Sequence, residues 1–284
     1  MKKHHGVFVI VFLMCCGGAV LAQEHKDGLE YEYFEDGKVH FERPYVGGVI
    51  EGMSKQFYPS GQLFEEIPYK AGKMEGDAKK FYENGTLLEE VRYVDGEREG
   101  LAKGYQENGE LFSETLYTKG KLNGPTKVYY DNHHLHLLEN YVDGLREGEF
   151  IEYYRTGQVM EKRPFVKNNL EGALTTYYVT GELQDEKNYK NGTLEGTAKA
   201  YAQNGQVLST VQYKNGEYDG PAISYYEDGH LRREMGFIEG KKQGELKEYD
   251  PSGQIKLLEV YDHGELVKRT EYGENGSALA TDVK

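Results

Sequence analysis

Glycine recurs every 24 residues in this chain, and this spacing constrains the fold more than any other feature. The ten glycines that keep the interval without a gap are Gly28, Gly52, Gly76, Gly100, Gly124, Gly148, Gly172, Gly196, Gly220 and Gly244. We number each 24-residue unit from its glycine, which is position 0. Self-similarity at this period indicates a repeat protein whose units stack, because no single unit can bury its apolar surface alone.

Each unit also contains two strand-like runs separated by turn signals. In the unit that begins at Gly76, the first run ends before Glu83-Asn84-Gly85, and the second run ends before Asp95-Gly96. Two short runs of mixed apolar and polar residues, separated by glycine turns, predict a β-hairpin. We therefore expect an all-β fold: an elongated, single-layer antiparallel β-hairpin repeat array (a β-meander) of about ten 24-residue units.

Two exceptions to the glycine rule support these turns. His133 replaces glycine in one first turn, and Asn168 replaces glycine in one second turn. Both residue types are enriched among the non-glycine residues that adopt a positive φ. We therefore expect both residues to occupy left-handed turn positions.

The turn length also predicts the strand register. A three-residue loop with a glycine bulge places Phe81 opposite Leu87. We expect Phe81, Leu87 and Tyr93 to share one face as an apolar stripe, with Tyr82 and Glu90 on the other face. Acids that precede the glycines are interpreted as cross-strand ion-pair partners of the lysines at position 3.

The first residues have the pattern of a secretory signal. Lys2 and Lys3 precede an apolar run, and Val20-Leu21-Ala22 forms a small-residue cleavage site. The expected organisation is a signal peptide at 1–22 cleaved after Ala22, the repeat array at 23–268, and a divergent capping unit with a tail at 269–284. This predicts the periplasm or cell envelope. The alternative is a lipoprotein anchored at Cys16.

Net charge restricts the class of partner. The formal charge is −14 at pH 7, and cleavage after Ala22 removes two lysines and no acid, which leaves −16. Such a surface repels nucleic acid and anionic membranes, and it steers a basic partner. The alternative interpretation is that the charge keeps an edge-rich sheet soluble.

No residue pattern points to an enzyme or to a cofactor. The chain has no phosphate loop and no Gly-x-Ser-x-Gly, and both cysteines lie in the expected signal peptide. The histidine cluster comprises His133, His134 and His136 beside Asp131. It fits either a polar hairpin tip or a metal site, and the sequence leaves that choice open.

A second row of tyrosines is the best candidate for a binding surface. Tyrosine supplies rigid, amphipathic contact area and is enriched at binding hot spots. The candidate partner-binding residues are Tyr58, Tyr82, Tyr130, Tyr154, Tyr178, Tyr226, Glu66, Glu90, Glu186 and Glu234. The alternative is that the row only supports cross-strand packing.

One unit shows the resemblance of the whole chain to a known family. It is carried by Gly148, Tyr153, Tyr154, Gly157, Val159, Phe165 and Gly172. This pattern resembles the bacterial MORN-repeat variant, and the resemblance covers nearly all of the expected mature chain. It implies a repeat protein of the antitoxin-like group, some members of which are immunity proteins.

These features together predict an exported, non-enzymatic, protein-binding repeat scaffold. The expected role is an immunity or antitoxin protein that neutralises a secreted toxin with a basic surface in the cell envelope. One alternative is a structural or adhesive envelope scaffold, and another is an envelope-polymer hydrolase with its site at His133 to His136. The apolar stripe could also support association between copies of the chain.

Overall fold

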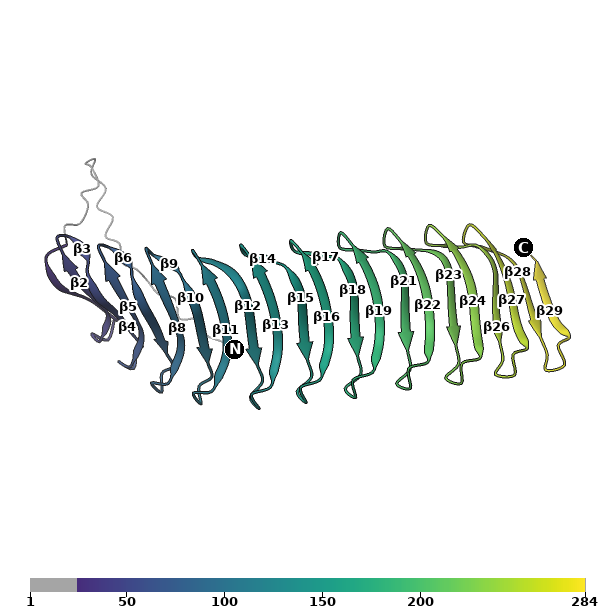
Figure 1. The fold of residues 1–284 in the computed structure, drawn as a ribbon, viewed down its shortest axis with the longest axis horizontal. Coiled ribbons are helices and arrows are strands. Elements are labelled where there is room, and N and C mark those ends of the chain that lie inside the picture. Colours follow the sequence, from purple (N-terminus) through teal and green to yellow (C-terminus); the bar gives the residue numbers. More distant parts are fainter. Residues whose placement is uncertain (1–24, 284) are drawn as a thin grey trace, which may run out of the picture.

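The protein forms one long antiparallel sheet, seen in a computed structural model that describes residues 25–283 (Figure 1). All 29 secondary-structure elements in this range are strands, and each main strand pairs with the next one along the chain. The expected all-β hairpin array is therefore confirmed. The expected signal peptide and Cys16 lie outside the described residues.

The strands fall into three groups. Those that begin at the repeated glycine are β1 (Gly28–Tyr33), β4 (Gly52–Phe57), β7 (Gly76–Phe81), β10 (Gly100–Tyr105), β15 (Gly148–Tyr153), β18 (Gly172–Tyr177), β21 (Gly196–Tyr201) and β26 (Gly244–Tyr249). The second strands of the hairpins are β2 (Val39–Val46), β5 (Leu63–Lys70), β8 (Leu87–Val94), β11 (Leu111–Thr118), β13 (Leu135–Val142), β16 (Val159–Val166), β19 (Leu183–Lys190), β22 (Val207–Lys214), β24 (Leu231–Ile238), β27 (Ile255–Asp262) and β29 (Ala278–Val283). Two-residue strands after the second turn are β3 (Val49–Ile50), β6 (Lys73–Met74), β9 (Glu97–Arg98), β14 (Leu145–Arg146), β17 (Asn169–Leu170), β20 (Thr193–Leu194) and β25 (Lys241–Lys242). In two places the short strand and the glycine strand are continuous, as β12 (Lys121–Tyr129) and β23 (Glu217–Tyr225), and β28 (Glu265–Tyr272) is continuous in the same way with Lys268 in place of the glycine.

The turns follow the chemistry that the sequence predicts. The second turn after β8 has φ of 52° at Asp95 and 86° at Gly96, as a two-residue hairpin turn of the primed type requires. His133 has φ 63° and Asn168 has φ 71°, so both glycine replacements occupy left-handed positions as expected. The first turns line one long edge of the sheet and the second turns line the other (Figure 1).

A β-bulge in every hairpin changes which side chains share a face. Phe81 pairs with Leu87 as expected, but the register shifts between Lys80 and Phe81, so that Lys80 pairs with Glu89. Alternation along β7 then places Phe81 and Leu87 on the face opposite Tyr93. The expectation of a single stripe formed by all three residues is therefore wrong.

We call the two sides the inner and outer faces. The inner face carries positions 2, 4, 13, 15 and 17, represented by Ala78, Val91 and Tyr93. The outer face carries positions 3, 5, 11 and 14. Contacts confirm this division, because the Tyr129 hydroxyl at position 5 donates to Glu114 at position 14, at 2.9 Å.

The buried core lies on the inner face. Phe150 and Leu246 at position 2 are 1% and 0% exposed, although the sheet has a single layer. The strands arch across the sheet (Figure 1), and the burial of positions 2 and 15 indicates that the arch closes over the inner face. Burial of apolar side chains in this arch is the main contribution to stability.

The acids that precede the glycines join each unit to its second turn. A side-chain oxygen of each accepts the backbone N–H of the residue 20 positions later, at 2.6–2.9 Å. The acids that do so are Asp27, Glu51, Glu75, Glu99, Glu147, Glu171 and Glu195. The expected ion pairs with the position 3 lysines are therefore replaced by hydrogen bonds to the backbone, which order the turn.

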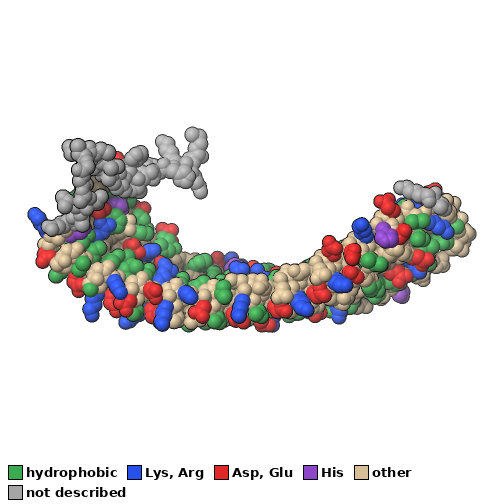
Figure 2. Space-filling view, turned by 90° about the horizontal axis from the view of Figure 1, so that it is seen from above, with side chains coloured by type: hydrophobic (Ala, Val, Ile, Leu, Met, Phe, Trp, Pro, Cys, Tyr) green, Lys and Arg blue, Asp and Glu red, His purple; other side chains and the backbone are tan. Residues whose placement is uncertain are grey.

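The whole molecule is elongated and bowed along its length (Figure 2). Acidic and basic side chains are interspersed among apolar ones over the visible surface. Within residues 25–283, no helix could serve as a membrane span.

Candidate functional site

The second tyrosine row links neighbouring units through its hydroxyl groups. Each hydroxyl donates to the backbone carbonyl of the position 5 aromatic residue in the following unit, at 2.7–2.9 Å. The donors are Tyr58, Tyr82, Tyr130, Tyr154, Tyr178 and Tyr226. All six are half-buried, so their hydroxyls are engaged while part of each ring remains accessible.

These tyrosines lie on the inner face. Tyr58 packs edge-on against Phe64, with ring centroids 5.1 Å apart, and Tyr130 lies 4.2 Å from His136. Side chains at position 12 contact position 4 of the next unit. For example, His136 lies 3.6 Å from Glu152. Because position 4 is on the inner face, the bulge places position 12 on the inner face as well. The tyrosine row therefore faces the core, contrary to the expected outward orientation.

The four glutamates of the candidate surface lie on the outer face instead. Glu90 pairs in register with Lys79 on one side and with Lys103 on the other. Glu66, Glu186 and Glu234 occupy the same position in their units. The structure thus separates the two groups that we expected to form one surface.

Lysines on adjacent strands lie in register with this glutamate row. Lys247 lies 3.7 Å from Glu234, and Lys127 lies 3.6 Å from Glu114. Exposed pairs of this kind contribute little to stability, about 0–1 kcal/mol each. The outer face is therefore a ladder of alternating charge rather than an acidic patch.

The pKa values of two tyrosines at position 5 are raised, in part by glutamates at position 14. Desolvation and the hydrogen bond to Glu114 raise the pKa of Tyr129 to about 12. Desolvation, with Glu234 as hydrogen-bond partner, also raises the pKa of Tyr249. These phenols stay protonated at neutral pH, so they serve as hydrogen-bond donors and not as bases.

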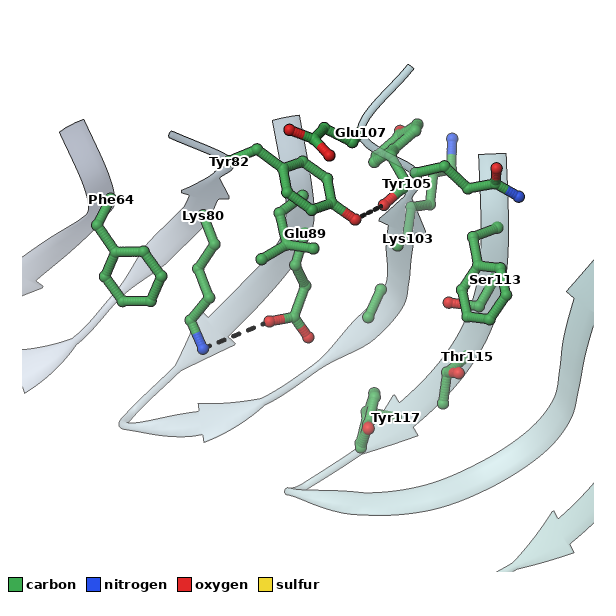
Figure 3. Close-up of a pocket in the computed structure, with 15 residues that line it drawn as sticks. Phe64, Lys80, Tyr82, Glu89, Lys103, Tyr105, Glu107, Ser113, Thr115 and Tyr117 are labelled. Carbon is green, nitrogen blue, oxygen red and sulfur yellow. Dashed lines mark hydrogen bonds and ion pairs between the residues drawn. The ribbon is translucent and has the colours of Figure 1, made fainter. Parts of the chain in front are cut away.

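A groove lies on the inner face, across the third and fourth units. Its volume is about 660 Å³. Its apolar rim consists of Phe64, Tyr82, Leu88 and Phe112, and its floor consists of Ala102, Gly104, Ser113, Thr115 and Tyr117. Figure 3 shows the Tyr82 hydroxyl directed at the Tyr105 carbonyl beside this groove.

Small residues in the fourth unit open the groove. Positions 4 and 13 are Gly104 and Ser113 here, whereas the preceding unit has Lys80 and Glu89 at the same positions. A Cβ on Gly104 would meet the Ser113 hydroxyl at 2.6 Å, so the Ser113 side chain would have to move to admit a larger residue at position 104. Our sequence reasoning missed this site, although the run of small residues at inner-face positions was visible in the sequence.

Side chains around the groove combine apolar and charged groups. Lys80 lies 3.5 Å from Glu65 and 3.6 Å from Glu89, and Figure 3 shows the pair with Glu89. Phe112 is 45% exposed, so an aromatic ring at the rim is available for contact. An open groove with an aromatic rim and a small-residue floor can accept apolar side chains of a protein partner.

The three histidines of the cluster each contact a different residue. His133 lies 3.5 Å from Glu110, His136 lies 3.6 Å from Glu152, and His134 contacts the Arg155 carbonyl at 3.0 Å. Asp131 pairs with Arg155. Among the residues that the structure describes, no three potential metal ligands gather at one point. The structure therefore brings no set of polar side chains together at His133 to His136, as the hydrolase alternative requires.

The fold defines a class, namely β-hairpin repeat proteins, and family comparison places the chain within it. The MORN repeat variant model matches nine segments, residues 26–46, 50–71, 74–95, 98–119, 146–167, 170–191, 194–215, 218–239 and 242–263. The chain belongs to this family, as its sequence pattern predicts. The matches skip 120–145, where Pro125 follows the glycine and His133 occupies the turn. These repeats indicate a protein-binding scaffold.

Other comparisons add no functional information. No protein with a curated description matches the chain. Solved structures with some likeness include the Photorhabdus luminescens Tc holotoxin pore, at 11% identity and TM-score 0.19, and a TcdB2-TccC3-TEV structure, at 11% identity and TM-score 0.16. The match covers 90% of this chain but 17% of each of those chains. TM-scores this low support no argument about fold or function.

Proposed function

We propose that this chain is an exported immunity protein, which binds a secreted toxin in the cell envelope and blocks it without catalysis. The observation that supports this proposal is the inner-face groove with its aromatic rim. A protein-binding scaffold needs such an anchor point, because a few buried aromatic or aliphatic contacts carry most of the energy of an interface.

A groove-filling substitution tests the proposal. Ser113→Phe should fill the floor of the groove, and the same repeat position is already phenylalanine in the first unit, at Phe41. The matched control is Asp185→Phe, which changes the same position three units away. Both variants should fold, because the repeat tolerates an aromatic residue at this position.

The readout is survival of a strain that lacks the gene, after challenge with the toxin that co-purifies with the protein. Wild type and Asp185→Phe should restore survival, and Ser113→Phe should not. If deletion of the gene leaves survival unchanged, the immunity role is wrong. If Ser113→Phe protects as well as wild type, toxin binding does not use this groove.

A second candidate is a structural spacer of the envelope. The regular tyrosine and glutamate links between units support it, since they stiffen the ribbon along its length. A spacer should keep its function after deletion of two whole units, residues 148–195. An inhibitor whose surface matches its partner in shape should lose activity, because the deletion changes the distance between the repeats on its two sides.

A further inference from the structure

A second hollow lies on the inner face between the eighth and ninth units. Its volume is about 380 Å³. Its floor is formed by Val211, Ala222, Met235 and Phe237, and its charged lining residues are Arg233 and Lys242. A smaller neighbouring hollow of about 130 Å³ shares Ser224 and Arg233 and adds Arg232, Glu248 and Lys256. The two form a continuous strip.

The charge of this strip is opposite to that of the chain. Four cations, Arg232, Arg233, Lys242 and Lys256, line the two hollows together with one acid, Glu248. Glu248 is shared, at 3.5 Å from Arg233 and 3.6 Å from Lys256. One carboxylate cannot neutralise four cations, so the strip is locally positive in a protein with a net charge of −14.

Neighbouring groups offset this excess only in part. Lys242 lies over the Tyr261 ring at 4.4 Å and donates to the Tyr261 hydroxyl, which in turn donates to Glu259 at 2.8 Å. Glu259, on the next hairpin, is buried and also lies 3.4 Å from Arg269, so this one carboxylate is shared between two cations. The groove in the third and fourth units differs, because Lys80 there lies between two glutamates.

We propose that this cationic strip binds an extended segment of a protein partner that carries an apolar side chain and a carboxylate two residues apart. The proposal rests on the protein-binding function and specifies the partner chemistry at this second location. In an extended chain, side chains two residues apart point the same way, about 7 Å from each other. The apolar side chain enters the Met235 hollow, and the carboxylate meets Arg232 and Arg233.

A peptide-binding measurement tests the assignment. The probe is a fluorescein-labelled peptide in which leucine and glutamate alternate at every second position, with serine between them. A matched peptide carries lysine in place of glutamate. The protein is the whole chain, in three forms: unchanged, the triple variant R232Q/R233Q/K256Q, and the control K55Q/K79Q/K199Q. The two triple variants change net charge equally, but the control lysines lie on the outer face.

The glutamate peptide should bind the unchanged protein and the control alike, and bind R232Q/R233Q/K256Q about tenfold more weakly. Added salt should weaken the binding, because the contacts are partly exposed. Equal binding of the lysine peptide, equal loss in the control variant, or no binding of the glutamate peptide would each overturn the proposal.

A further variant separates apolar recognition from simple anion attraction. Met235→Ser keeps all four cations and removes the apolar floor, so it should also weaken the glutamate peptide. If Met235→Ser has no effect and inorganic phosphate competes fully, the strip is an anion site only and the segment proposal fails. Survival in the toxin challenge is an independent readout, so failure here leaves the groove at Ser113 to be judged separately.

Discussion

At the scale of single residues, the Tyr154 hydroxyl shows how one atom joins two units. It donates to the Tyr177 carbonyl at 2.8 Å from a half-buried position. Tyr154→Phe leaves the ring in place and removes only this donor, so the free energy of unfolding should fall by about 1 kcal/mol. Denaturant unfolding measures the change, with the slope of the unfolding free energy against denaturant concentration expected to stay the same. Tyr33→Phe is the control, because Tyr33 is 59% exposed, and it should change stability little.

Tyr129 gives a prediction for alkaline pH. Its pKa in the folded protein is about 12, raised from 10.0 by desolvation and by the hydrogen bond to Glu114. The folded state therefore holds this proton longer than the unfolded chain, so the contribution to stability is complete below pH 10 and is lost as pH rises towards 12. Absorbance titration of tyrosinate should show a late-titrating group that disappears in Tyr129→Phe. A titration curve identical to that of wild type would contradict the assignment.

At the scale of elements, the acid before each glycine orders the second turn. Glu171 accepts the Asn191 backbone N–H at 2.7 Å, and Asn191 has φ 51°. Glu171→Ala should leave that N–H without its partner, lower stability by about 1 kcal/mol and speed hydrogen exchange at Asn191. Glu35→Ala removes an exposed acid in a first turn and serves as the comparison. Unchanged exchange at Asn191 would rule out this role.

Strand identity and turns could be predicted from the sequence because each depends on a local pattern. The glycine interval and the aromatic residues at positions 5 and 17 determine the hairpins, and His133 and Asn168 behave as turn chemistry requires. Face assignment failed because it depends on a bulge within the ladder. One extra residue between Leu87 and Glu89 reverses which side chains lie beside Tyr93.

The candidate site was only partly accessible to sequence reasoning for the same reason. Tyr82 does border the groove at Gly104, but Glu90 lies on the opposite face. The groove itself depends on the small size of Gly104 and Ser113, and two small residues do not form a sequence motif that can be recognised. The Arg232 and Arg233 pair is visible in the sequence, yet its placement on the inner face again requires the bulge.

At the scale of the whole molecule, the ribbon should behave as a sum of exchangeable units. Deletion of residues 148–195 removes β15, β16, β18 and β19 with their short strands, and it brings Tyr130 to the carbonyl of Tyr201. The protein should remain folded and become shorter by about 19 Å, since four main strands are lost at about 4.8 Å each. Small-angle scattering measures the length, and circular dichroism shows whether the β-content per residue is kept. Collapse to an unfolded or compact form would contradict independent stacking of units.

The central claim is that this protein binds its partner with the inner face of the sheet. Site-specific photo-crosslinking tests it most directly, with the photoreactive residue placed at Ser113 in the inner groove or at the adjacent Glu114 on the outer face of the same unit. We predict that the toxin which co-purifies with the protein crosslinks from position 113 and not from position 114. Crosslinking from position 114 alone would contradict the claim.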